Sequence, residues 1–161
     1  SEEKFKNIVE NAREVIMLTR IDVIIDYISP AAKEILGYEP AELIGTSPVI
    51  FHPDDKEMVQ AKFVQAIQGK PLLDFRYRAV TKTGKIKYIS HSCHPIMAQN
   101  KIRYILSTIV DITERIQAEL ENKKRTEELE RFNKLAVDRE LKMVELKKKI
   151  KELEKTRPIT E

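Results

Sequence analysis

The chain has 161 residues, of which 42% are hydrophobic and 34% charged, and this balance fits one globular domain with an appendage. The net charge of +3 comes from interspersed acidic and basic residues, which argues against nucleic acid and membrane surfaces as partners. The single cysteine, Cys93, excludes an internal disulfide framework and favours a reducing compartment, so we expect a cytoplasmic protein. We expect no membrane span, because no apolar run is long enough, and no signal peptide.

Charge is distributed unevenly along the chain. Residues 114–157 carry 25 charged side chains in 44 positions and contain neither Gly nor Pro, whereas all four glycines lie in residues 1–113. A charged segment without helix breakers is typical of a long, solvent-exposed helix. We therefore expect a folded domain over residues 1–113, a helix over residues 114–157 and a short tail over residues 158–161.

Three signals define the elements of the first segment: helical spacing of apolar residues, β-branched runs, and turn residues between them. In chain order, the predicted elements are a helix over residues 2–12, strands over 14–20 and 23–29, short helices over 31–36 and 40–44, a longer helix over 53–68, and strands over 72–82, 86–98 and 102–112. Thr83-Gly84 and Gln99-Asn100 are turn signals, and such short connections fit antiparallel neighbours. The predicted fold class is α+β, a five-stranded antiparallel sheet with helices on one face.

Two predicted helices begin with residues that are typical of helix N-termini. Ser29 before Pro30 predicts a side-chain N-cap followed by proline at the first helical position. Asp54 and Asp55 follow Pro53 at the start of the longer helix, where two carboxylates complement the helix dipole. We interpret this acidic pair as structural, and not as a catalytic pair of carboxylates.

Five short motifs, in this order, resemble the landmarks of the PAS domain family. They are residues 26–32 (DYISPAA), 36–45 (LGYEPAELIG), 52–55 (HPDD), 83–84 (TG) and 111–115 (DITER). The resemblance covers roughly residues 3–115, and Tyr88 stands where such domains often carry Trp. It implies a PAS fold and a sensory module, with a small cavity between sheet and helices and an outer sheet face available for dimerisation.

The resemblance also implies which side chains face the cavity. They are Phe75, Tyr77 and Ala79 on one strand, and Ile89, His91 and Cys93 on the next. Because residues i and i+2 of a strand share a face, His91 and Cys93 would give a mostly apolar pocket two polar contacts, as in small-molecule sites. Two alternatives stay open: His91 is a buried histidine bonded within the protein, and Cys93 is an inert buried thiol.

No metal or chromophore site is expected. His94 lies on the strand face opposite His91 and Cys93, and the Cys and His spacings of structural zinc sites are absent. The flavin-binding branch of the family carries an Asn-Cys-Arg motif on a helix, and the haem-binding branch carries a histidine within the long helix. Residues 54–68 contain neither cysteine nor histidine, so the cofactor is unknown and no flavin or haem signature is present.

Apolar residues in the charged segment follow a heptad repeat. Seven of its eight a and d positions are apolar, and Arg139 is the exception. These seam positions are Leu129, Phe132, Ala136, Arg139, Met143, Leu146, Ile150 and Leu153. The repeat predicts a coiled coil, and the resemblance favours a parallel homodimer; a single solvated helix is the alternative. Ile112, Ile116 and Leu120 are out of phase with this seam, so we expect a phase slip at residues 121–128.

The strand–helix boundary is the predicted route for a signal leaving the domain. Asp111 precedes the helix and Glu114 follows three residues later, which is an acidic variant of the capping box. Thr113 lies between them. We expect Asp111 alone to end the last strand and to fix the starting angle of the outgoing helix, and we expect a signal to pass through Asp111–Thr113.

The sequence favours signalling over catalysis. Four glycines cannot build a glycine-rich phosphate loop, so we expect no enzyme activity in this chain. We expect a signal-transduction sensor that detects a small molecule, a redox change or a partner in its cavity and transmits it through a dimeric helix. Two alternatives remain: the input half of a sensor histidine kinase or similar enzyme of a two-component system, whose catalytic domain is a downstream partner, and an adaptor that binds only protein.

Overall fold

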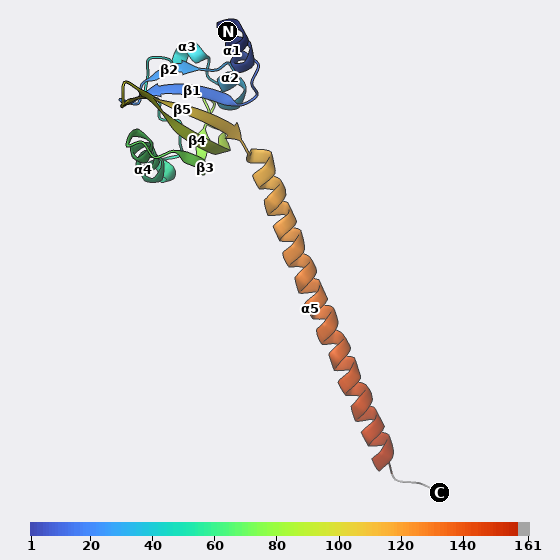
Figure 1. Ribbon diagram of the computed structural model, residues 1–161. Helices are drawn as coiled ribbons and strands as arrows, with labels where there is room; N and C mark the ends of the chain where they lie inside the picture. The colour runs from blue at the N-terminus through green and yellow to red at the C-terminus, as the bar shows by residue number, and fades with distance from the viewer. Residues whose placement is uncertain (158–161) are drawn as a thin grey trace. The chain divides into compact units, whose positions relative to one another are not determined.

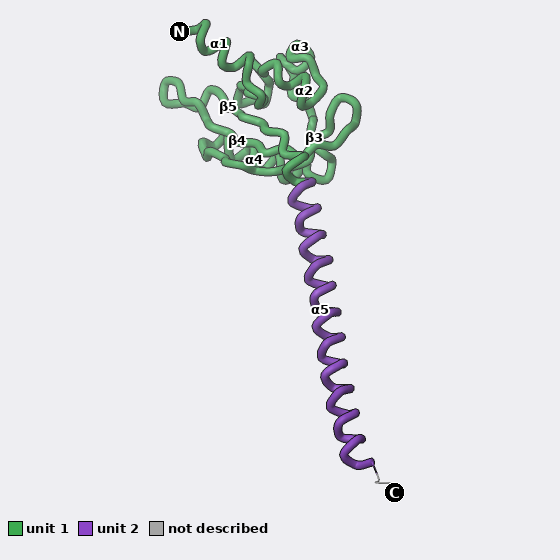
Figure 2. Tube along the Cα trace, turned by 90° about the vertical axis from the view of Figure 1, so that its right-hand side faces the viewer, with its two compact units in different colours: residues 1–116 green, residues 117–161 purple. Residues whose placement is uncertain are grey.

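The computed structural model describes residues 1–157, and the chain divides into two compact units, Ser1–Ile116 and Gln117–Glu161 (Figure 2). The first unit contains a sheet with its helices, and the second consists mainly of one helix, α5 (Thr113–Thr156). The division falls three residues beyond the boundary expected from composition. The predicted tail over residues 158–161 lies outside the described residues.

The first unit is an α+β domain with the predicted sheet (Figure 1). Its elements are α1 (Glu2–Glu10), β1 (Val15–Arg20), β2 (Ile25–Ile28), α2 (Ala31–Leu36), α3 (Pro40–Leu43), the 3-10 turn η1 (Pro53–Asp55), α4 (Lys56–Ile67), β3 (Leu72–Val80), β4 (Ile86–Ala98) and β5 (Lys101–Asp111). The five strands pair antiparallel in the order β2-β1-β5-β4-β3. The fold class predicted from the sequence is confirmed, and the PAS-like topology places the last strand, β5, in the middle of the sheet.

Alternation along the strands separates a buried face from an outer face. On β1, Val15, Met17 and Thr19 are buried, whereas Ile16 and Leu18 between them are partly exposed. The buried face packs against α2 and α4, whose buried side chains belong to the same apolar cluster. The burial of apolar surface, which contributes about 25 cal/mol per Å², is the main stabilisation of such a layer.

Turn chemistry explains the connection between the two longest strands. Gln99 and Asn100 both have positive φ, 53° and 61°, as a two-residue type I′ turn requires. This turn lets β4 and β5 pair along most of their lengths, from Ile89 opposite Asp111 to Ala98 opposite Lys101. The turn signal at these residues is therefore confirmed.

Of the two predicted helix-start motifs, the structure corrects the one at Ser29. Ser29 does not cap α2: its Oγ accepts a hydrogen bond from the backbone N–H of Ile16 at 2.9 Å, which ties the chain before the helix to β1. The residue that precedes α2 is Pro30.

The longer helix starts as predicted: Pro53 opens the turn η1, which runs directly into α4 at Lys56. Asp54 and Asp55 lie in this first turn, and Asp55 also pairs with a strand residue, as described below.

Helix α5 is continuous over 44 residues and none of its side chains is buried in the single chain. The apolar seam positions other than Ala136 are between 52% and 68% exposed. Such a row of exposed apolar side chains is what a coiled-coil partner would cover, so the dimeric coil stays a prediction. Within residues 1–157, no helix combines the length and the apolar character that crossing a bilayer requires.

Candidate functional site

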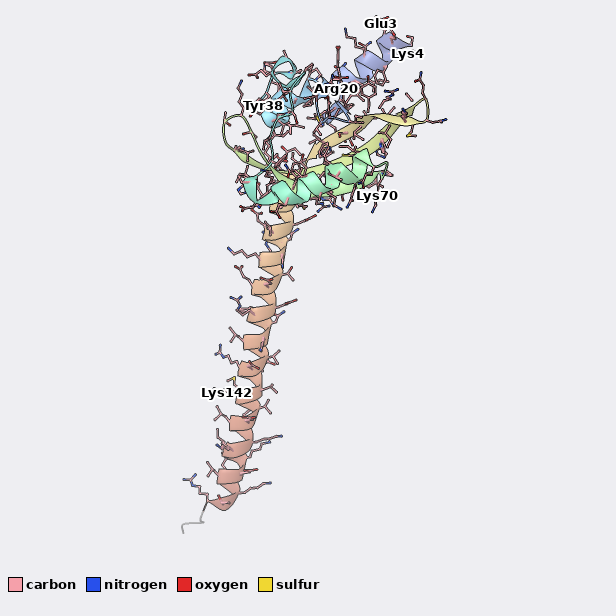
Figure 3. The ribbon with its side chains drawn as sticks, turned by 90° about the vertical axis from the view of Figure 1, so that its left-hand side faces the viewer. Glu3, Lys4, Arg20, Tyr38, Lys70 and Lys142 are labelled. Atoms are coloured by element: carbon pink, nitrogen blue, oxygen red, sulfur yellow. The ribbon has the colours of Figure 1, made fainter. Side chains whose placement is uncertain are left out.

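A cavity of about 510 Å³ lies between the buried face of the sheet, α4 and residues 47–51. Its lining is Met17, Thr19, Asp22, Val23, Ile25, Ser47, Pro48, Val49, Ile50, Phe51, Val59, Gln60, Phe63, Val64, Ile67, Tyr77, His91 and Ile109. Figure 3 shows α4, which ends shortly before Lys70, lying across the strands that form the floor. The volume falls in the range of about 300–1,000 Å³ typical of small-molecule pockets.

The mouth of the cavity is formed by its exposed lining residues, Asp22, Ser47, Val49, Gln60 and Val64. Asp22 is held there by Arg20 (labelled in Figure 3), whose Nη2 lies 2.7 Å from Asp22 Oδ2. This hydrogen bond is the main reason that the pKa of the Asp22 carboxyl lies below its usual value. Val23, beside it, has φ of 68°, a conformation that β-branched residues rarely adopt.

At the deep end, an aromatic cluster surrounds His91. Its ring stacks on Phe75 at 4.9 Å between centroids and meets the edge of Phe63 at 5.7 Å. Its Nδ1 is 3.1 Å from the Tyr77 hydroxyl oxygen, which is a hydrogen-bonding distance. The His91 side chain is 1% exposed, so water competes little for these contacts.

Burial keeps the polar groups at this end uncharged. It lowers the pKa of His91 to about 4, and it raises the pKa of the Tyr77 hydroxyl well above its ordinary value. Near neutral pH the cavity floor therefore presents a neutral imidazole and a neutral phenol. A small-molecule contact at His91 would be a neutral hydrogen bond and not an ion pair.

The six predicted pocket residues are all buried, but only two of them line the cavity. Tyr77 and His91 do so, whereas Phe75, Ala79, Ile89 and Cys93 belong to the apolar core around it. Cys93 Sγ lies 3.5 Å from Ser107 Oγ, and burial raises the pKa of its thiol. Contact of any of these residues with a ligand stays a prediction.

Sequence reasoning missed the walls contributed by α4 and by residues 47–51. It also missed Thr19, which is 2% exposed and lines the cavity. The signal was available, because Thr19 follows Val15 and Met17 at a spacing of two on the buried face of β1. No comparable signal marks residues 47–51, which form no regular helix.

Histidine and cysteine on β4 do not come together as metal ligands. His91 and Cys93 are buried on one face, and His94 is exposed on the other, as the strand alternation predicts. Among the described residues, no group of three or more His, Cys, Asp or Glu side chains is arranged to hold a metal ion.

A second set of contacts joins β4 to the start of α5. The Thr113 hydroxyl donates to Asp111 Oδ1 at 2.6 Å and accepts from the backbone N–H of Tyr88 at 3.0 Å. The backbone N–H of Ile112 donates to the Tyr88 carbonyl at 2.9 Å. Lys87 Nζ lies 3.0 Å from Asp111 Oδ2. Neighbouring residues 87 and 88 of β4 thus hold the end of β5 and the first residue of the helix.

The predicted capping box at this junction is wrong. The Asp111 carboxylate accepts from the backbone N–H of Thr113, the first helical residue, but Glu114 donates and accepts no side-chain hydrogen bond within residues 1–157. A capping-box glutamate would accept from the backbone N–H of the capping residue; here Thr113 and Lys87 bond the Asp111 carboxylate instead. Burial alone would raise the pKa of Asp111, but the bonds from Thr113 and Lys87 outweigh it and hold the pKa below its usual value.

Comparisons with known proteins agree with this geometry. The family model described as PAS fold matches residues 25–109. White collar 1 protein of Neurospora crassa is 36% identical over 75 residues, which cover 45% of this chain but only 6% of the length of that relative.

Solved structures share the fold over most of the chain. The PAS domain of a protein from Colwellia psychrerythraea has a TM-score of 0.64 and 22% identity, covering 70% of this chain and 98% of that one. A sensory box histidine kinase/response regulator from Burkholderia thailandensis has a TM-score of 0.61 and 26% identity, covering 80% and 98%. With a family match over more than half of its residues and the sheet order, cavity and strand–helix junction described above, this chain belongs to the PAS family, whose domains are typical of signalling proteins.

Proposed function

We propose that this chain detects a small molecule in its PAS cavity and transmits the binding event through α5. One observation carries the proposal: a single strand, β4, supplies His91 to the cavity and, three residues away, Tyr88 to the junction with α5. Both backbone groups of Tyr88 are bonded to that junction. A ligand that shifted β4 would therefore change the two hydrogen bonds that hold the start of the helix.

Ligand binding fits the cavity better than thiol redox chemistry does. Cys93 is fully buried, and its raised pKa keeps it protonated at neutral pH. Because the thiolate is the reactive form, Cys93 is poorly placed as a redox sensor. A ligand can shift a conformational equilibrium only by its difference in affinity for the two states, and a group that bonds His91 in one state supplies such a difference.

The output half of the proposal is a parallel homodimer of α5. The exposed apolar seam supports dimerisation, and the likeness to a sensory box histidine kinase/response regulator supports a kinase or other output domain as the downstream partner. In that case this chain is an input module, and catalysis belongs to the partner. An adaptor function would keep the dimer and dispense with the ligand.

Native mass spectrometry of the purified chain separates sensor from adaptor. We expect mass peaks of a dimer that carries a retained molecule or takes up added acetophenone, a small neutral probe. Val59→Phe should abolish uptake by filling the cavity, and Ala61→Phe, which adds the same ring at an exposed position on α4, should not. A dimer that neither retains nor takes up any small molecule would contradict ligand sensing and favour the adaptor.

A further inference from the structure

Two buried side-chain polar atoms lack a hydrogen-bond partner in the part of the chain that the structure describes. They are Thr19 Oγ1 and His91 Nε2, and both residues line the cavity. A buried polar group without a partner costs about 1–3 kcal/mol, so native proteins rarely keep one without a reason. Because both residues line the same cavity, a molecule bound there is the source we infer for their partners.

The Tyr77–His91 contact determines what His91 offers to the occupant. If the Tyr77 hydroxyl donates to Nδ1, the neutral imidazole carries its proton on Nε2, and only this N–H remains unpaired. If Nδ1 carries the proton, the Tyr77 hydroxyl hydrogen and the Nε2 lone pair both remain unpaired. The first arrangement leaves fewer buried groups without partners, so we assign the proton to Nε2. The Nε2–H group then needs a hydrogen-bond acceptor.

The lining also determines the charge that the cavity accepts. Among the described residues that line it, only Asp22 is charged; it lies at the mouth and is paired with Arg20. The lining contains no lysine or arginine, and His91 is neutral, so a buried anion would have no counter-charge. A buried cation would meet only neutral groups at the deep end.

The two unpaired atoms lie far apart along the sheet. His91 is level with Ile109 and Val15 across the strands, and Thr19 is four residues from Val15. At about 3.4 Å per residue, this places Thr19 roughly 14 Å from the level of His91 along the strand direction. Apolar lining residues, among them Met17 and Val59, fill the distance between them.

We propose that the cavity binds an uncharged, elongated and largely apolar molecule whose carbonyl or other acceptor group bonds His91 Nε2–H. A second polar group of the molecule reaches Thr19, whose hydroxyl can donate or accept. This inference rests on the proposed function, because it names the ligand class of the same cavity. It makes Tyr77 a positioning residue, which fixes the proton of His91 on the nitrogen that faces the ligand.

Matched probes and variants of the full chain test the acceptor contact. Acetophenone and α-methylstyrene have nearly the same shape, but only the first has an acceptor. We expect His91→Phe to weaken acetophenone binding about tenfold, in line with the loss of one buried hydrogen bond, and to leave α-methylstyrene binding nearly unchanged. Thr19→Val should change neither affinity, because these short probes occupy the His91 end. Benzoate should bind at least tenfold more weakly than acetophenone at pH 7.

The position of the His91 proton is measured directly on the native protein, and Tyr77→Phe then tests what fixes it. Imidazole ¹⁵N shifts should show Nε2 protonated and Nδ1 bare, and Tyr77→Phe should convert this signal to a mixture of both tautomers. Four results would each overturn the ligand class alone. Two concern His91: a protonated Nδ1 in the native protein, or equal losses of affinity for both probes in His91→Phe. The other two are an effect of Thr19→Val as large as that of His91→Phe, and benzoate binding as tight as acetophenone binding. Failure of acetophenone and α-methylstyrene to bind the native protein, together with no retained molecule in its native mass spectrum, would overturn the proposed function as well.

Discussion

His91 combines a polar ring with almost complete burial, and this combination has a measurable consequence. Its neighbours are the rings of Phe63, Phe75 and Tyr77, and none of these offers a negative charge to a protonated imidazole. The burial that lowers the pKa of His91 to about 4 therefore also links protonation to unfolding.

We predict a loss of stability between pH 6.5 and 4 that depends on His91. The unfolded chain binds a proton at His91 near pH 6.5 and the folded chain only near pH 4, so the free energy of unfolding falls as the pH falls through this interval. The full effect is about 3 kcal/mol, present above pH 6.5 and lost by about pH 4. Urea unfolding at several pH values should show this slope in the native chain and a smaller one in His91→Phe; equal slopes would contradict the burial account.

For individual residues, the sequence predicts the face of a strand on which a side chain lies, but not its neighbours in space. Strand alternation correctly predicts that His91 and Cys93 share one face and that His94 lies on the other, and the family resemblance indicates which face is buried. It cannot predict which buried residues border empty space, because that depends on how α4 and residues 47–51 pack. Nor can it predict that Thr113 and Lys87 hold Asp111, because Lys87 lies 24 positions away in sequence.

At the scale of elements, one ion pair fastens α4 to the sheet. Arg78 Nη2 and Nε lie 2.7 and 3.1 Å from the two oxygens of Asp55, and the backbone N–H of Arg78 donates to the same carboxylate at 2.8 Å. The side-chain hydrogen bond from Arg78 is the main cause of the lowered pKa of Asp55. The pair anchors the start of the helix that forms one wall of the cavity.

We predict that Asp55→Ala destabilises the domain by about 1–3 kcal/mol, because it removes three hydrogen bonds to one partly buried carboxylate. Asp54→Ala is the matched control. Its side chain is 73% exposed and lies 3.7 Å from Arg78, so we expect a loss of less than about 1 kcal/mol. Urea unfolding of both variants makes the comparison, and equal losses would show that the Asp55 anchor is unimportant.

Two of the hydrogen bonds at the strand–helix junction are made by one hydroxyl, that of Thr113. Thr113→Val keeps the side-chain shape but removes the bonds to Asp111 and to the Tyr88 N–H, so we predict faster hydrogen exchange at residues 112–116. Thr126→Val, at an exposed position within α5, controls for the helix propensity of valine. Unchanged exchange in Thr113→Val would show that the junction is held by other contacts.

The heptad of α5 gives a prediction about its one charged seam position. In a parallel dimer, Arg139→Leu should strengthen association about tenfold or more, because it completes the apolar seam. Arg131→Leu, outside the seam, should have little effect. Sedimentation equilibrium measures both, and equal effects would contradict the register. The seam does not include Val137, Leu141 and Val144, which lie on the opposite side of the helix at about 100° per residue.

Elements were more predictable than their ends. The turn signals and β-branched runs place all five strands, because these features act locally. The bounds predicted for α2 are correct, but the bonds of Ser29 and Asp55 were not predicted, because their partners, Ile16 and Arg78, lie on strands distant in sequence. Propensity and spacing contain no information about such partners.

In the whole molecule, strand pairing connects the cavity to the start of the helix within the first unit. Tyr77 pairs with Ile89, and Ile89 pairs with Asp111, so the cavity and the junction are joined by adjacent ladder positions. Packed strands shift as units, which allows occupancy at His91 to alter the bonds of Tyr88. Coupling of this kind is established only by an observable that changes at the second site when the first is occupied.

Hydrogen exchange at residues 88 and 111–116, measured with and without saturating acetophenone, tests that coupling most directly. We predict a several-fold change in exchange at these residues in the native chain, together with protection of α4. The change should be absent in Val59→Phe, whose cavity is filled, and present in Ala61→Phe. Protection confined to α4, with no change at residues 88 and 111–116, would contradict the claim that cavity occupancy is transmitted to the helix.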